Sequence, residues 1–252
     1  MRSIPTLSCP VRRVDVSAYT IPTEYPESDG TLAWKATTLV LVEVSAAGHT
    51  GVGYTYADLA TAILVKTTLA EVIQGRDVFS IPECWEVMRR AVRNMGKPGI
   101  ASMAMAAVDS ALWDLKARVL DLPVVTLLGA AREGIPVYGS GGFTSYTVSQ
   151  VQRQLAEWAD QQVSSVKMKV GRSPDDDRDR VRAAREAIGH ETELFVDANG
   201  AYSRKQALAF AEKFFEESQV CWFEEPVSSD DLQGLRIIRE RAPAHMDIAA
   251  GE

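Results

Sequence analysis

Four charged residues recur at nearly equal spacing in the second half of the chain. Lys169, Asp197, Glu224 and Glu252 close the short apolar segments V-S-S-V-K-M-K, E-L-F-V-D, V-C-W-F-E and M-D-I-A-A-G-E. The intervals between them are 28, 27 and 28 residues. One strand, one helix and two loops of a βα repeat consume about this many residues. Because parallel strands end at the same rim, the spacing predicts that the four charged side chains meet there.

Three carboxylates at one rim favour a metal site. They would repel one another unless a cation lay between them. Oxygen ligands without a nearby His or Cys suit Mg²⁺, with Mn²⁺ as the alternative. The sequence therefore predicts a divalent metal bound by Asp197, Glu224 and Glu252.

A pair of lysines ends the first of these strands. Lys167 and Lys169 are two residues apart, so in a strand their side chains point to the same face. Two ammonium groups held side by side near a divalent metal lower each other's proton affinity, which produces an amine able to act as a base near neutral pH. An isolated K-x-K at a strand end is usually only solvated. The three carboxylates at matching positions favour the catalytic interpretation here.

Two residues lie next to the predicted metal ligands. Glu225 follows Glu224 directly, so we expect it to face away from the barrel interior and to form a salt bridge or a hydrogen bond. Asn199 lies two residues past Asp197 and could reach substrate or a ligand of the metal. Its simpler role, a turn residue in A-N-G, is about equally supported.

The segments around these residues alternate between strand and helix patterns from Ile135 onward. Ile135–Gly139 reads as the first strand of the repeat, and Ser203 and Gln206 form a capping-box pattern at the start of a helix. The other expected helices cover about 148–161, the residues between Ser173 and Gly189, and 230–241. Strands alternating with helices predict an α/β fold with a parallel sheet or barrel.

The first half of the chain has a different pattern, with strands first and helices afterwards. We expect strands at Arg13–Thr20 and Thr37–Val44, a polar loop at Pro22–Trp34 between them, and a turn at Gly48 into a further strand, G-V-G-Y-T-Y. Helices are expected at about 58–74, 81–94 and 101–120. The sequence thus predicts an α+β domain at residues 1–129 and a barrel domain at residues 130–252.

Composition limits the class of protein. The chain has 252 residues, 46% of them hydrophobic, and a formal net charge of −7, which argues against nucleic acid as a partner. The three cysteines form no C-x-x-C pair, no apolar run approaches the roughly 20 residues of a membrane span, and the N-terminus lacks an apolar signal region. We expect a cytoplasmic globular homo-oligomer without a membrane or nucleic-acid partner.

The motifs K-M-K-V-G, V-D-A-N-G, W-F-E-E-P, the closing G-E and A-V-D-S-A-L-W-D-L-K-A-R carry a resemblance. Together they resemble the enolase superfamily, specifically the mandelate racemase/muconate lactonizing enzyme group, over nearly all of the chain. The resemblance implies an α+β capping domain followed by the first part of a modified (β/α) TIM-like barrel. It implies Mg²⁺ on the three carboxylates, Lys169 as general base and Lys167 as the group that polarises the substrate carboxylate. It also implies that the loop at 22–34 and Tyr54 shape substrate specificity.

The activity implied by the resemblance is Mg²⁺-dependent removal of a proton α to a carboxylate, which gives an enediolate. We expect a small carboxylate substrate and an acid-sugar dehydratase or a racemase/epimerase. A muconate-type cycloisomerase is the alternative.

The chain departs from the family pattern in length. A full barrel takes roughly 250 residues, whereas 252 − 129 = 123 residues follow Gly129. In the family, later strands supply a second base, a Lys or a His–Asp pair. We therefore expect either a piece of a longer enzyme or a truncated product, and the alternative to an enzyme is a non-catalytic fragment.

Overall fold

The structure is a computed structural model that describes residues 8–251. The chain divides into two compact units. The first contains the described residues up to Pro22 together with Ala36–Glu133, and the second contains Thr23–Lys35 and the described residues from Gly134 onward. The end of the first strand, the turn after it and the start of the second strand therefore belong with the second half of the chain.

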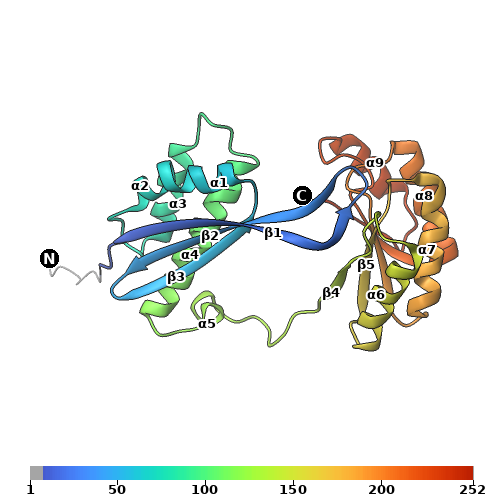
Figure 1. Ribbon diagram of the computed structural model, residues 1–252, viewed down its shortest axis with the longest axis horizontal. Coiled ribbons are helices and arrows are strands. Elements are labelled where there is room, and N and C mark those ends of the chain that lie inside the picture. Colours follow the sequence, from blue (N-terminus) through green and yellow to red (C-terminus); the bar gives the residue numbers. More distant parts are fainter. Residues whose placement is uncertain (1–7, 252) are drawn as a thin grey trace. The chain divides into compact units, whose positions relative to one another are not determined.

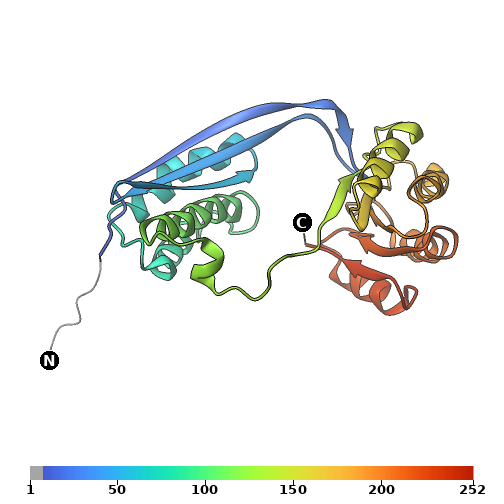
Figure 2. The same ribbon diagram turned by 90° about the horizontal axis from the view of Figure 1, so that it is seen from below.

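The first unit combines a three-stranded sheet of order β1-β2-β3 with helices. Figure 2 shows these helices on one face of the sheet. The strands are β1 (Arg13–Ser28), β2 (Ala33–Ala46) and β3 (His49–Tyr56), and the helical segments are α1 (Leu59–Leu64), the π-helical η1 (Val65–Leu69), α2 (Ala70–Ile73), α3 (Ile81–Ala91), α4 (Ile100–Val119) and α5 (Val124–Leu128). The strands followed by helices agree with the predicted α+β class.

Close packing of α4 on β3 holds the first unit together (Figure 1). α4 presents small buried residues, among them Ala107 and Ala111, and β3 presents Gly51 and Gly53. A Cβ atom on Gly53 would lie 2.0 Å from the Ala107 carbonyl oxygen, and one on Gly51 would lie 2.2 Å from the Ala111 carbonyl oxygen. Glycine is therefore required at both positions, because the two backbones touch.

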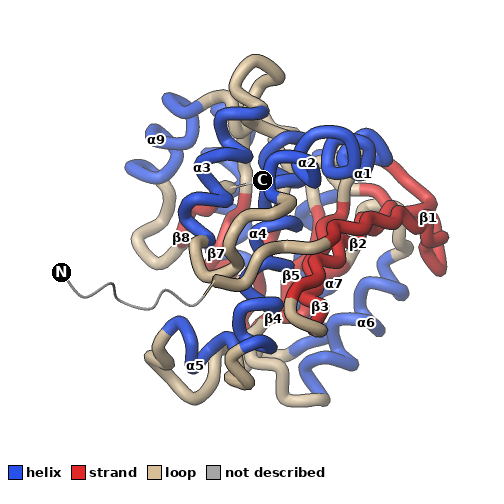
Figure 3. The backbone as a smooth tube through the Cα atoms, turned by 90° about the vertical axis from the view of Figure 1, so that its left-hand side faces the viewer, coloured by secondary structure: helices blue, strands red, loops and turns tan. Residues whose placement is uncertain are grey.

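The predicted loop at Pro22–Trp34 is wrong. β1 continues to Ser28 and β2 begins at Ala33, so only four residues remain for the turn. Figure 3 shows the two long strands side by side. Pro22 and Pro26 lie inside β1, which forms an edge of the described sheet, where a residue without an N–H group is tolerated.

The second unit is an α/β layer. Its described strands pair in parallel in the order β4-β5-β6-β7-β8. The strands are β4 (Tyr138–Gly141), β5 (Ser165–Lys169), β6 (Glu193–Asp197), β7 (Val220–Glu224) and β8 (Asp247–Ala249), and the helices are α6 (Val148–Asp160), α7 (Pro174–Ile188), α8 (Arg204–Ser218) and α9 (Leu232–Arg241). The helices cover one face of the sheet (Figure 1). This is the parallel α/β arrangement that the sequence predicts for the first part of a TIM-like barrel.

Local sequence signals explain most of these elements. The predicted capping box of Ser203 and Gln206 is confirmed, with both reciprocal hydrogen bonds present. The predicted strand at Ile135–Gly139 is displaced, because β4 begins only at Tyr138, where pairing with Ser165 of β5 starts. Ile135 is 73% exposed and forms no part of the sheet.

Within residues 8–251, no helix is both long and apolar enough to cross a bilayer.

The turn between β1 and β2 packs against the second unit, to which it belongs. The Thr144 N–H donates to the Ser28 carbonyl oxygen at 2.8 Å, and the Thr144 hydroxyl donates to the Asp29 carbonyl oxygen at 2.8 Å. A Cβ atom on Gly30 would lie 2.2 Å from the Ala198 carbonyl oxygen. The turn therefore touches the backbone directly after β6.

A buried carboxylate supports the loop that follows β5. Asp177 is 1% exposed and accepts hydrogen bonds from the Gly171 N–H and the Tyr202 hydroxyl. Burial raises the pKa of the Asp177 carboxyl, against the lowering effect of these two hydrogen bonds. This contact fixes the segment that leaves β5 just after the two lysines.

We predict that Gly53→Ala destabilises the first unit by about 1–3 kcal/mol, because the added methyl group meets helix backbone that cannot rotate away. Gly134→Ala is the matched control, since no atom lies within 4 Å of its Cβ position, and it should change the free energy of unfolding by less than about 0.5 kcal/mol. Urea denaturation followed by circular dichroism measures both. Equal stability of the two variants would contradict the close packing of α4 on β3.

Candidate active site

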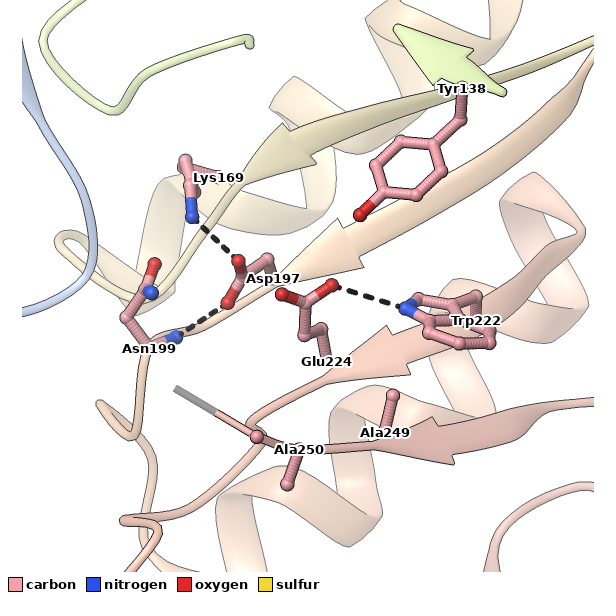
Figure 4. A pocket seen from close by; sticks show the side chains of 9 residues that line it. Tyr138, Lys169, Asp197, Asn199, Trp222, Glu224, Ala249 and Ala250 are labelled. Carbon is pink, nitrogen blue, oxygen red and sulfur yellow. Dashed lines mark hydrogen bonds and ion pairs between the residues drawn. The ribbon is translucent and has the colours of Figure 1, made fainter. Parts of the chain in front are cut away.

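Two lysines and two carboxylates meet at the carboxyl ends of three neighbouring strands. Lys169 of β5 pairs in register with Asp197 of β6, and Asp197 pairs with Glu224 of β7. The Lys169 Nζ lies 2.6 Å from Asp197 Oδ2 (Figure 4). The Lys167 Nζ lies 2.7 Å from Glu224 Oε2 and 3.3 Å from Asp197 Oδ2. The structure therefore brings Lys169, Asp197 and Glu224 together at one rim as predicted, and Lys167 lies beside them.

The cluster is largely removed from solvent on the side of Lys167. Asp197 is 1% exposed and Lys167 is 5% exposed. Burial acts to lower the pKa of the Lys167 ammonium, but the hydrogen bond to Glu224 and the charges of Asp197 and Glu224 together outweigh it, so that the pKa is raised. The sequence predicted that the lysines depress each other's proton affinity. Without a metal the direction for Lys167 is opposite, because two carboxylates hold its ammonium group, and the lowering expected beside a divalent metal stays a prediction.

A pocket of about 360 Å³ opens beside the cluster. It is lined by Tyr138, Lys169, Asp197, Asn199, Trp222, Glu224, Ala249, Ala250 and Gly251. Figure 4 shows the Lys169 and Glu224 side chains on either side of Asp197, at the ends of their strands. A small molecule in this pocket would lie next to both an ammonium group and two carboxylates.

Asn199 lies at a position that suits both of its predicted roles. Its backbone is left-handed, with φ of 44°, which suits the turn after β6. Its N–H donates to Asp197 Oδ1 at 3.0 Å, and the residue lines the pocket. A contact between Asn199 and substrate stays a prediction.

The site also has an aromatic side, which was not predicted from the sequence. The Lys167 Nζ lies 5.3 Å from the centre of the Tyr138 ring, and the Trp222 Nε1 donates to Glu224 Oε2 at 3.2 Å. Phe195 lies between these two rings, with centroid distances of 5.5 and 5.7 Å. The alternation that paired Lys167 with Lys169 also places Trp222 on the face of Glu224 and Phe195 on the face of Asp197, so this signal was available.

Three predicted site residues do not line this pocket as described. Lys167 belongs to the charged cluster but not to the lining of the pocket. Tyr54 lies on β3 of the first unit, is 61% exposed and contacts the Tyr56 ring. Its role in substrate binding stays a prediction. Glu252 lies outside the described residues, so its role as a metal ligand also stays a prediction.

The donor atoms fit Mg²⁺ in their chemistry. Asp197 and Glu224 offer only carboxylate oxygens, the hard donors that Mg²⁺ prefers, beside an open pocket. The same oxygens already attract the two ammonium groups, which shows that this part of the rim gathers positive charge. Across residues 8–251, no group of three or more His, Cys, Asp or Glu side chains is placed to hold a metal ion. Asp197 and Glu224 are two of the three predicted ligands, and their binding of a metal stays a prediction.

Two family models match the chain. Residues 14–129 match the mandelate racemase/muconate lactonizing enzyme N-terminal domain, and residues 150–252 match the enolase C-terminal domain-like family. Each match lies within one half of the chain, on the α+β and the α/β side respectively.

Named relatives match over both halves. The chain is 35% identical over 251 residues to 3,6-anhydro-alpha-L-galactonate cycloisomerase of Streptomyces coelicolor, which covers 96% of the chain and 68% of the relative. It is 32% identical over 202 residues to L-talarate/galactarate dehydratase of Salmonella typhimurium, which covers 78% of the chain and 50% of the relative. The chain thus spans about half to two thirds of the length of these relatives.

Solved structures give the same result. A mandelate racemase/muconate lactonizing enzyme-like protein from Rubrobacter xylanophilus matches with a TM-score of 0.95 and 55% identity, over 96% of this chain and 68% of that one. A racemase from Streptomyces coelicolor with bound magnesium matches with a TM-score of 0.90 and 33% identity, over 96% of this chain and 69% of that one. The chain belongs to the mandelate racemase/muconate lactonizing enzyme group of the enolase superfamily.

Proposed function

We propose that this protein takes part in Mg²⁺-dependent removal of a proton α to a carboxylate, with an enediolate as the intermediate. The observation that carries the proposal is the cluster at the pocket, where Lys169 and Lys167 lie against Asp197 and Glu224. A base and a source of positive charge are both needed for this reaction, and the cluster holds candidates for each.

The chemical difficulty lies in the charge that proton removal creates. An α-proton of a carboxylate is weakly acidic, because its loss places a second negative charge on the carboxyl oxygens. Bound Mg²⁺, held by Asp197 and Glu224 with Glu252 as the proposed third ligand, would supply positive charge at those oxygens. The Lys167 ammonium, which is 5% exposed and lies 2.7 Å from Glu224 Oε2, would add to this charge.

Lys169 is the proposed base. It lines the pocket, whereas Lys167 is more deeply buried. When its amine takes up the α-proton, the resulting ammonium has the Asp197 carboxylate at 2.6 Å to stabilise it. This contact favours the transfer of the proton from carbon to Lys169.

The proposed substrates are acid sugars. The dehydratase and the cycloisomerase described above carry acid-sugar names, and the relatives also include an arabinonate dehydratase and an L-rhamnonate dehydratase. Proton removal is a step that dehydration, epimerisation and cycloisomerisation can share. Groups on the opposite face of the substrate would decide among these outcomes, and acid-sugar dehydration or epimerisation is the outcome we propose.

Three further features of the proposal have their basis in the sequence. They are Mn²⁺ as a substitute for Mg²⁺, a location in the cytoplasm and assembly into a homo-oligomer. The donor chemistry of Asp197 and Glu224 supports the first.

We predict that Mg²⁺ raises the melting temperature of the protein, because a ligand that binds only the folded state stabilises it by about 2.7 kcal/mol at a concentration of 100 times its Kd. Glu224→Gln should remove most of this shift. Glu216→Gln is the control, since Glu216 is an exposed residue of α8 outside the pocket, and it should keep the full shift. Scanning fluorimetry with and without Mg²⁺ measures all three proteins. A full shift in Glu224→Gln would place the metal site elsewhere.

We predict that Lys169→Ala slows exchange of the substrate α-proton with solvent deuterium by about 10²–10⁴-fold, the usual contribution of a general base. Mg²⁺ affinity should change little, because Lys169 is not one of the proposed metal ligands. Lys167→Ala should weaken substrate binding as well as turnover. Proton NMR in deuterium oxide follows the exchange and calorimetry follows the metal. Exchange at the wild-type rate in Lys169→Ala would assign the base to another residue.

A further inference from the structure

Glu225 connects the ends of three neighbouring strands. It directly follows β7, and its N–H donates to the Ala249 carbonyl oxygen of β8 at 2.8 Å. Its own carbonyl oxygen accepts a hydrogen bond from the Gly200 N–H, in the turn after β6, at 2.8 Å. Its side-chain Oε1 accepts the Gly251 N–H at 3.3 Å. One residue thus links the segments that leave β6, β7 and β8.

The same three segments carry the predicted metal ligands. Asp197 ends β6, three residues before Gly200, and Glu224 ends β7 directly before Glu225. Gly251 directly precedes Glu252 in the sequence. The hydrogen bonds of Glu225 therefore span the residues that must hold their spacing for a metal to bind.

The position of Glu225 is costly for a residue with a charged side chain. Its φ is 42°, in the left-handed region that glycine adopts without a steric penalty and that costs other residues of order 1 kcal/mol or more. The side chain is also 4% exposed, so a carboxylate has been withdrawn from water. Glycine at this position would avoid both the backbone strain and the burial of a carboxylate. The hydrogen bond to the Gly251 N–H is a contribution that glycine could not make.

We propose that Glu225 is a positioning residue of the metal site, which acts by holding the segment at Gly251 against the ends of β6 and β7. The inference rests on the proposed function, because it concerns the same metal. Glu225 acts through the reach of its acceptor oxygen to the Gly251 N–H. Its negative charge is not the feature that matters.

Two amide variants separate reach from charge. Glu225→Gln loses the charge but keeps an oxygen at the same distance from the backbone. Glu225→Asn loses the charge and is one methylene shorter, so it cannot reach Gly251, while Asn tolerates the left-handed conformation well. Asp109→Asn is the control, since it removes a half-buried carboxylate of α4, in the first unit and outside the pocket.

The experiment is calorimetric titration of Mg²⁺ into the wild-type protein and the three variants, with hydrogen exchange of the Gly251 amide as a second readout. Glu225→Asn should weaken Mg²⁺ binding by about 10–100-fold, the range seen when groups that orient metal ligands are removed, and should expose the Gly251 amide to exchange. Glu225→Gln and Asp109→Asn should stay within a few-fold of wild type.

Each of three outcomes would overturn either the proposed function or the role of Glu225, and the three can be told apart. If the wild-type protein binds no Mg²⁺, the proposed function fails, and with it the basis of this inference. If the wild type binds Mg²⁺ and Glu225→Asn binds it equally well, only the role of Glu225 is overturned. If Glu225→Gln is as weak as Glu225→Asn, the charge matters and positioning through Gly251 is wrong. Circular dichroism of each variant without metal checks that it is folded.

Discussion

The ion-paired cluster of Lys167, Lys169, Asp197 and Glu224 is the interaction on which the rest of the site depends. A buried charge without a partner costs several kcal/mol, so these side chains are tolerable inside the protein only as a balanced set. Two ammonium groups face two carboxylates at 2.6–3.3 Å, which satisfies this condition in the described part of the chain. The balance also limits substitution, because removing one member leaves another uncompensated.

Strand geometry creates this balance, and the surrounding contacts preserve it. Parallel pairing sets Lys169, Asp197 and Glu224 side by side in register, each at the end of its strand. The segments beyond the strand ends are then fixed individually. Asp177 holds the loop after β5, the β1–β2 turn at Gly30 lies against the backbone after β6, and Glu225 links the segments after β6, β7 and β8. Hydrogen bonds and close contacts to backbone groups thus hold the segments beyond the strand ends.

The sequence was sufficient to predict β5, β6 and β7 and the convergence of their charged ends. Both follow from local rules, namely the two-residue alternation of a strand and the length of a βα repeat, so Lys167, Lys169, Asp197 and Glu224 could be brought together without a structure. The capping box at Ser203 follows from an equally local rule.

The failures all depend on contacts between distant residues. The extent of β1 was missed because Pro22 and Pro26 read as loop residues, and only the place of β1 at a sheet edge makes them acceptable. The ion pairs of Lys167 with Asp197 and Glu224 were not predicted, because spacing says that two lysines are neighbours but not which carboxylate oxygens they reach.

The central claim is that this pocket removes an α-proton from a carboxylate with the help of a divalent metal. The most direct measurement is mass spectrometry of an acid-sugar library incubated with the protein in deuterium oxide, once with Mg²⁺ and once with a chelator. We expect that at least one acid sugar gains a single α-deuterium, or is converted to a product, only when Mg²⁺ is present. Exchange that continues at the same rate in the chelator would contradict the metal-assisted mechanism. An absence of exchange and conversion across the library, in a protein that binds Mg²⁺ at Asp197 and Glu224, would contradict the proposed substrate class.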